Sequence, residues 1–167
     1  MKSFKFVGIS AVAIGLTLGT GLALADSPHF LFANSSISSA TGVLTVAFKE
    51  VGLGTAATTE TVTITVDSAQ ATYQCFNNGG KHPKAGNKET VSTSLTNVGT
   101  FPVRNGQTTG SITAGPPGPG AFSCPSGQDL FLVAVTYSGI QVLGSAGDTL
   151  GATPDPISTG PIMVEIL

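Results

Sequence analysis

The side chains with the greatest capacity for chemistry lie together in CFNNGGKHPKAGNKE, residues 75–89. Gly79-Gly80 can adopt positive φ and expose backbone N–H groups, and the lysines and the histidine beside them add charge and donors. This composition predicts a long cationic loop and makes it the best candidate in the chain for binding an anionic ligand. The candidate ligand-binding residues are Asn78, Lys81, His82, Lys84 and Lys88. The alternative is a solvated loop, in which asparagine and glycine make turns and lysine keeps strand edges soluble.

Motifs for metals and phosphates are absent from the sequence. It contains neither a GxxxxGK[ST] phosphate loop nor a Dx[DN]x[DN]G calcium loop. The two histidines, His29 and His82, have no partner at ligand spacing, and Asp148 and Asp155 are isolated in the sequence. We therefore expect neither a metal site nor a cofactor.

Catalytic groups are also sparse. Serine is abundant, but no GxSxG elbow is present, and only two histidines are available for a triad. Glycoside cleavage requires two carboxylates close together, and no sequence pattern places any two of the available carboxylates side by side. These carboxylates are Glu50, Glu60, Asp67, Glu89 and Asp129. We interpret them as exposed charges at strand ends and predict no enzymatic activity.

Aromatic residues do not predict a platform for stacking sugars. The chain has no tryptophan, and its two tyrosines, Tyr73 and Tyr137, fall at expected core positions. The phenylalanines are expected in the core as well: Phe30, Phe32, Phe48, Phe76, Phe101, Phe122 and Phe131. The sequence still allows a sugar-binding site built from polar loop residues.

The only cysteines are Cys75 and Cys124. A single pair in an exported chain predicts one disulfide, whereas no CxxC spacing points to a metal or redox site. The bond would close a loop of about 50 residues, which the chain-entropy account values at about 4 kcal/mol. It would also bring the loops around 77–88 and 115–123 near each other.

Alternation with period two dominates the chain and predicts half-buried strands. In ETVTITV (60–66), Val62, Ile64 and Val66 share one face and the threonines share the other. In ATYQCF (71–76) the inward set moves to odd numbers, so DSAQ (67–70) must hold a bulge or a switch between sheets.

Further strands are expected at 42–48, 89–98, 107–113, 129–142 and 162–167, with 129–142 at the centre of the core. Arg104-Asn105-Gly106 predicts a hairpin turn between 89–98 and a return strand at 107–113. PPGPG (116–120) excludes regular structure, and 144–161 is loop-like. These segments predict an all-β, immunoglobulin-like Greek-key β-sandwich of about eight or nine short strands, with a β-barrel as the alternative.

The first 25 residues predict a cleaved secretory signal. Lys2 and Lys5 precede the uncharged run 7–24, and Ala23-Leu24-Ala25 fits the cleavage pattern. An uncleaved anchor is the alternative. Residues 26–167 would then form one domain with five cations and nine carboxylates, which offers no basic face for nucleic acid. We expect a secreted protein with no stable membrane anchor after cleavage.

Three stretches, FKEVGLG (48–54), residues 75–89 and SCPSGQDLFLVAVTYSGIQV (123–142), resemble a group of secreted bacterial β-sandwich proteins with no established activity. The resemblance implies export and one compact domain, and no active residue can be carried over from it. Our leading hypothesis is a non-catalytic extracellular binding or surface-associated module that recognises a glycan, another anionic ligand or a protein. The alternatives are a structural envelope or matrix protein and, last, a hydrolase.

Overall fold

The computed structural model describes residues 27–77 and 82–166, and for residues 82–86 only the course of the backbone. The signal segment 1–25 and residues 78–81 therefore lie outside the described residues. The described part is all-β and contains no helix. Its strands are β1 (His29–Ile37), β2 (Leu44–Val51), β3 (Thr59–Asn77), β4 (His82–Pro102), β5 (Gln107–Ala114), β6 (Gln128–Leu143), β7 (Thr149–Gly151), β8 (Ile157–Ser158) and β9 (Val164–Ile166).

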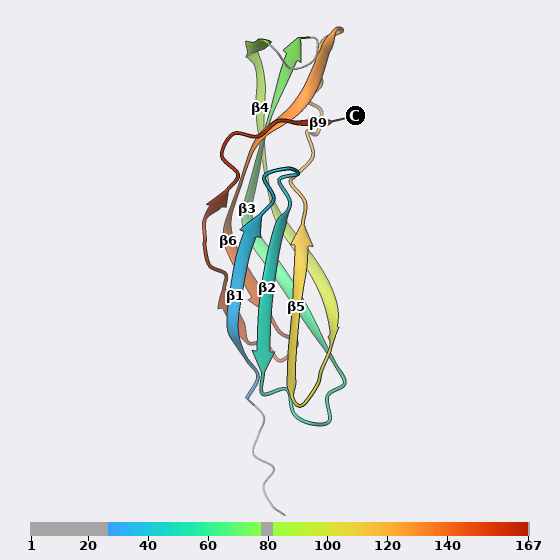
Figure 1. Ribbon diagram of the computed structural model, residues 1–167, viewed down its shortest axis with the longest axis vertical. Helices are drawn as coiled ribbons and strands as arrows, with labels where there is room; N and C mark the ends of the chain where they lie inside the picture. The colour runs from blue at the N-terminus through green and yellow to red at the C-terminus, as the bar shows by residue number, and fades with distance from the viewer. Residues whose placement is uncertain (1–26, 78–81, 167) are drawn as a thin grey trace, which may run out of the picture.

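The strands form two sheets, as the sandwich prediction requires. One has the order β1-β2-β5, and the other has the order β4-β3-β6-β7, with β8 and β9 also pairing with β6. Figure 1 shows the three-stranded sheet in front of the lower half of β3, β4 and β6, whose upper halves extend beyond it. The sheets are not closed into a barrel, so the barrel alternative is not supported.

Three of the predicted short strands are in fact long. The strands β3, β4 and β6 have 19, 21 and 16 residues. The loop predicted at 77–88 is correspondingly shorter, because β3 continues to Asn77 and β4 begins at His82. His82 and Pro83 pair with Asn77 and Phe76, and Lys88 pairs with Gln74, whereas residues 84–87 have no partner in the register of β3. The irregular part therefore contains Gly86 and Asn87, two of the residues on which the loop prediction rested.

The change of phase predicted at 67–70 is confirmed as a β-bulge. The register between β3 and β4 advances from Val66↔Leu95 to Ala69↔Thr93, so β3 carries one extra residue. Val66 is buried before the bulge, and Ala69 and Tyr73 are buried after it. The extra residue moves the inward set from even to odd numbers and keeps both halves of β3 facing the same core.

The Asn105-Gly106 turn is confirmed, but its strands do not pair as a hairpin. Asn105 and Gly106 have φ of 53° and 70°, and Arg104 and Gln107 exchange backbone hydrogen bonds of 2.9 and 3.2 Å. Beyond this bridge, β5 pairs with β2 in the other sheet. The predicted return strand thus crosses between sheets, and β3 is the only described strand that pairs with β4.

The core lies between the sheets and contains both tyrosines. Tyr137 is fully buried and donates a 2.7 Å hydrogen bond to the carbonyl of Gly42. Tyr73 of β3 is also buried, and it donates a 2.6 Å bond to the carbonyl of Pro117. The proline-rich connection between β5 and β6 therefore lies over this part of the larger sheet. Phe30 and Phe48 are buried as predicted, whereas Phe32 is 36 % exposed, which corrects the prediction for that residue.

The C-terminal segment lines one edge of β6. β7, β8 and β9 pair in turn with residues 141–143, 136–137 and 130–132 of that strand. Prolines at 154, 156 and 161 separate the three short pieces, because proline cannot donate to a ladder. Part of the region predicted as loop, 144–161, is therefore in strands. The closing strand predicted at 162–167 is present as β9.

Candidate functional site

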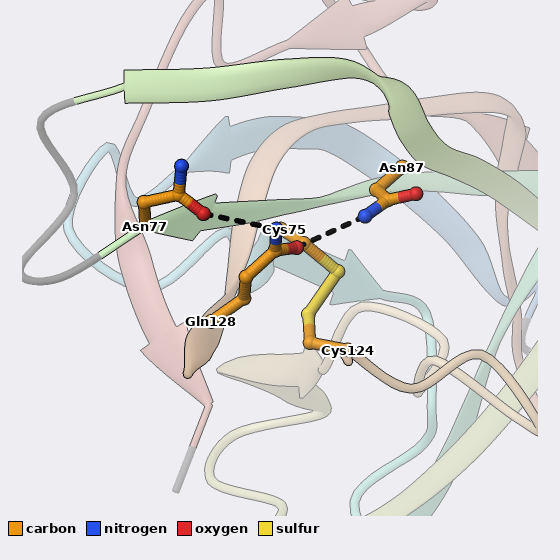
Figure 2. The surroundings of a disulfide bond; sticks show 5 residues. All are labelled: Cys75, Asn77, Asn87, Cys124 and Gln128. Carbon is orange, nitrogen blue, oxygen red and sulfur yellow. Dashed lines mark hydrogen bonds between the residues drawn. A yellow bond between two sulfur atoms is a disulfide. The ribbon is translucent and has the colours of Figure 1, made fainter. Parts of the chain in front are cut away.

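The predicted disulfide is present at one end of the molecule. Cys75 is buried near the end of β3, and Cys124 lies in the connection that leads to β6. The bond joins these segments next to the start of β6, as Figure 2 shows. The loop around 115–123 is therefore tied to the end of β3, as expected from the sequence.

A chain of amide side chains crosses the surface beside the disulfide. Asn87 Nδ2 donates to Gln128 Oε1 at 2.9 Å, and Gln128 Nε2 donates to Asn77 Oδ1 at 2.9 Å (Figure 2). All three residues are half-buried and come from β4, β6 and β3. The bonds orient the three amides, which hold the ends of the long strands in register. Sequence reasoning missed this chain because its members lie far apart in the sequence.

The predicted ligand-binding set is only partly described. Asn78 and Lys81 lie outside the described residues. His82 and Lys84 are in β4, with His82 opposite Asn77, but their side chains are outside the description. Lys88 is exposed on β4, opposite Gln74. The anion site predicted here stays a prediction.

An open pocket of about 370 Å³ lies at the opposite end, beside the Asn105-Gly106 turn. It is lined by Lys49, Pro102, Arg104, Asn105, Gln107, Thr108 and Thr109. Two cations, two amides and two hydroxyl groups therefore surround it, and its lining contains no carboxylate. Neither Lys49 nor Arg104 makes an ion pair within the described residues. The pocket can hold an anionic or hydroxyl-rich group through charge and hydrogen bonds.

The backbone around the pocket explains how these side chains meet. Lys49 lies directly opposite Thr109 of β5 and Phe32 of β1 in the register of the smaller sheet. The half-exposed Phe32 therefore borders Lys49 on the outer face. Arg104 reaches the pocket from the turn that brings the chain from β4 to β5. Alternation along β2 indicates that Lys49 faces outward, but it could not show that Arg104 lies beside it.

Two carboxylates that we predicted to be exposed are buried between the sheets. Glu50 is 0 % exposed and Glu60 is 5 % exposed. Both occupy inward positions, since Glu50 continues the phase of Phe48 and Glu60 the phase of Val62. The alternation of buried and exposed positions already placed both glutamates on the inward face, so the prediction that they are exposed strand-end charges was wrong.

Asp148 is not isolated as its sequence position suggested, because the turn between β6 and β7 brings it to Glu50. Burial, the nearby charges of Asp148 and Glu60, and a hydrogen bond from the protonated Glu50 carboxyl group to Asp148 raise the pKa of Glu50 to about 7. When both groups are ionised, all four carboxylate oxygens of Glu50 and Asp148 are buried without a hydrogen-bond donor. Glu60 differs, because it accepts bonds from Ser145 N at 2.7 Å and Ser145 Oγ at 3.0 Å.

Asp155, the other carboxylate of the late loop, has a structural role. Its two oxygens accept bonds from Gly139 N at 3.1 Å and Ile140 N at 3.0 Å. Within residues 27–77 and 82–166, no group of three or more His, Cys, Asp and Glu side chains could hold a metal ion by itself.

Comparisons with known proteins do not assign the chain to a family. No protein-family model, no curated protein and no solved structure matches it. The resemblance to secreted bacterial β-sandwich proteins therefore stays a prediction. The described part of the chain contains no helix long and apolar enough to cross a membrane.

Proposed function

We propose that the protein is an exported, non-catalytic binding module that recognises an acidic glycan. The observation that carries this proposal is the pocket beside the Asn105-Gly106 turn, where Lys49 and Arg104 converge among hydroxyl and amide groups. Carboxylate or sulfate groups would pair with the two cations, and sugar hydroxyls would bond to threonine, asparagine and glutamine. The half-exposed ring of Phe32 beside Lys49 adds an apolar surface for a sugar face.

The architecture proposed for this module is an immunoglobulin-like Greek-key sandwich. The proposal is supported by the strand neighbours, since β2 pairs with β5 in one sheet and β3 pairs with β6 in the other. Strands B and E, and strands C and F, are neighbours in the same way in immunoglobulin domains. In such domains, loops at the ends of the sandwich carry recognition, and the pocket lies at one of these ends.

The burial of Glu50 and Glu60 disfavours a role in glycoside cleavage. Glycoside cleavage requires two carboxyl groups on either side of a bound sugar. Glu50 is 0 % exposed, so a sugar chain cannot reach it without unfolding that end of the sandwich. The disulfide fits the proposed export, because disulfides persist in oxidising compartments.

The proposal is tested by binding of the chain from residue 26 onward to immobilised polygalacturonate, with a neutral glucan as the second ligand. We expect binding to polygalacturonate that weakens with added salt. Lys49→Ala and Arg104→Ala should each weaken it about tenfold or more, the usual effect of losing a charged hydrogen bond. Lys88→Ala tests the competing anion site predicted at 75–89, and it should bind like the parent protein if the pocket, which Lys88 does not line, is the site.

All variants should keep the melting temperature of the parent, because Lys49 and Arg104 make no ion pair in the described residues. Equal losses in Lys49→Ala and Lys88→Ala would show that the pocket does not bind the polymer specifically, and this result would overturn the proposal. Equal binding to the two polymers would overturn it as well.

A structural role is the second candidate, and the free edge of β4 favours it. This strand of 21 residues pairs on one side with β3, and no described strand pairs with its other side. Its side chains in 90–97 are mostly exposed Thr, Ser and Asn. A sheet edge of this length can join a second sheet. Concentration-dependent sedimentation of the protein, weakened by Thr96→Pro, would support assembly through this edge.

A further inference from the structure

Two buried carboxylates near the end of β2, those of Glu50 and Asp148, have no hydrogen-bond donor or cation of the described residues beside them that would compensate their burial. Glu50 lies at the end of β2 with its side chain fully inside, and both of its oxygens lack a donor. Both Asp148 oxygens are also buried without a donor. Neither residue makes an ion pair with a basic side chain of the described residues. Burying ionised carboxylates without partners is expensive, so something must balance their charge.

Two carboxylates can bond to each other only through a shared proton or a cation that both of them bind. Repulsion among Glu50, Asp148 and Glu60 disfavours the fully ionised cluster in the absence of either. The surrounding loop distinguishes the three residues. Ser145 satisfies Glu60 through its backbone N–H and its hydroxyl group, whereas no backbone or side-chain donor of the described residues reaches the buried oxygens of Glu50 and Asp148.

The turn 144–148 forms a cradle around these oxygens. Gly144 N donates to the carbonyl of Asp148 at 2.9 Å, and Gly147 N donates to the carbonyl of Gly144 at 3.0 Å. A Cβ at Gly144 would lie 2.5 Å from Asp148 Oδ1 and 2.8 Å from Glu50 Oε1. A side chain at this position would therefore displace the two carboxylates.

We propose that Glu50 and Asp148 bind a calcium ion that ties the turn 144–148 to the end of β2. The donors are oxygens alone, which suits calcium and does not suit zinc, whose sites use histidine and cysteine. Calcium accepts a mixture of carboxylates, backbone carbonyls and water, so two carboxylates suffice when other oxygens complete the shell. Magnesium demands a nearly ideal octahedron and gives up its water reluctantly.

The proposed site is distinct from the glycan pocket, because Glu50 and Asp148 do not line it, although Glu50 follows Lys49 in β2 and lies opposite Thr108 of β5. Asp148 is half-buried as a residue, so the site lies close to the surface on the side of the turn, although the carboxylate oxygens themselves are buried. With two charged ligands, we expect the weak affinity of extracellular calcium modules, a Kd of about 10⁻⁴ to 10⁻³ M.

The test is thermal unfolding of chelator-treated protein from residue 26 onward at neutral pH, titrated with calcium chloride, magnesium chloride or sodium chloride at matched ionic strength. We expect a saturable rise of the melting temperature with calcium, a smaller one with magnesium and none with sodium. Isothermal titration calorimetry should give one calcium per chain.

Glu50→Gln and Asp148→Asn should each remove the calcium-dependent rise, even where the loss of repulsion stabilises the calcium-free protein. Gly144→Ala should weaken calcium binding because its Cβ enters the cradle. Glu89→Gln, on the exposed face of β4, should respond to calcium like the parent protein.

The proposal is overturned if calcium produces no saturable shift, or if Glu50→Gln and Asp148→Asn keep the full shift. In either case the two carboxylates share a proton instead. A separate loss of polygalacturonate binding in Lys49→Ala would leave this result unchanged.

Discussion

The ring of Phe101 stands edge-on to the ring of Phe48, with ring centroids 4.9 Å apart and planes at 83°. The two rings link the edge strand β4 to the middle strand of the opposite sheet. Gly99 and Gly110 make room for this contact, because a Cβ at either position would collide with the ring of Phe101. The two sheets therefore meet on the side of β4 and β5 through an aromatic ring placed over two glycines.

Gly110→Ala should destabilise the protein by about 1–3 kcal/mol, the usual cost of overpacking a filled core. The added methyl group would push Phe101 away from Phe48. Equilibrium unfolding in urea measures the change. Gly151→Ala is the matched control, since it adds the same methyl group to a strand where nothing lies within 4 Å of the new Cβ. Equal midpoints for the two variants would contradict the prediction.

Deletion of Ser68 should abolish the native fold. Without the extra residue of the bulge, the part of β3 after Val66 would turn its buried side chains outward and present Thr72 and Gln74 to the core. Cys75 would then point away from Cys124, so a thiol assay should detect free cysteines. Ser68→Ala is the control and should cost less than about 1 kcal/mol, because it loses only a 3.3 Å bond to Ser92 at the surface. A disulfide formed normally in the deletion variant would refute the role of the bulge.

Loss of the disulfide should destabilise the protein by about 4 kcal/mol in the chain-entropy account. The bond joins residues separated by 49 positions and so restricts the conformations of the unfolded chain. The double variant Cys75→Ala/Cys124→Ala should therefore unfold at a lower urea concentration than the parent. Treatment of the parent with a reductant should lower its midpoint by a similar amount, and the same reductant should leave the double variant unchanged. A reductant-insensitive parent would contradict this prediction.

Ionisation of the buried tyrosines should make stability depend on pH in the alkaline range. Burial raises the pKa of Tyr137 to about 12 and raises that of Tyr73 above 10.0, since the phenolate is disfavoured away from water. Below pH 10 both states keep the protons. Above it the unfolded state loses them first, so stability falls as the pH rises through about 12, by roughly 2–3 kcal/mol for Tyr137.

The measurement is the near-ultraviolet absorbance of phenolate, to which no tryptophan contributes in this chain. The native titration should lie above pH 10, and addition of urea should return it to the ordinary value. Tyr137→Phe should reduce the alkaline loss of stability and lose the bond to the Gly42 carbonyl, at about 1 kcal/mol. A native midpoint at pH 10 for both tyrosines would contradict their burial.

Much of the local structure could be predicted from the sequence because alternation is a property of a single strand. The phases of 60–66 and 71–76 located the bulge, and the two cysteines predicted their own bond. Alternation along β2 and β3 also places Glu50 and Glu60 on the inward face, although charged residues were expected to be exposed. The all-β class and the buried tyrosines also followed from residue type and period alone.

The candidate sites required the tertiary structure, because they depend on which strands become neighbours. Pairing of β5 with β2 placed Thr109 opposite Lys49, and the crossing turn brought Arg104 to the same pocket. The turn after β6 placed Asp148 against Glu50. Alternation shows which face a side chain takes, and it carries no information about distant strands. Those contacts arise only when the two sheets pack together and bury their shared core.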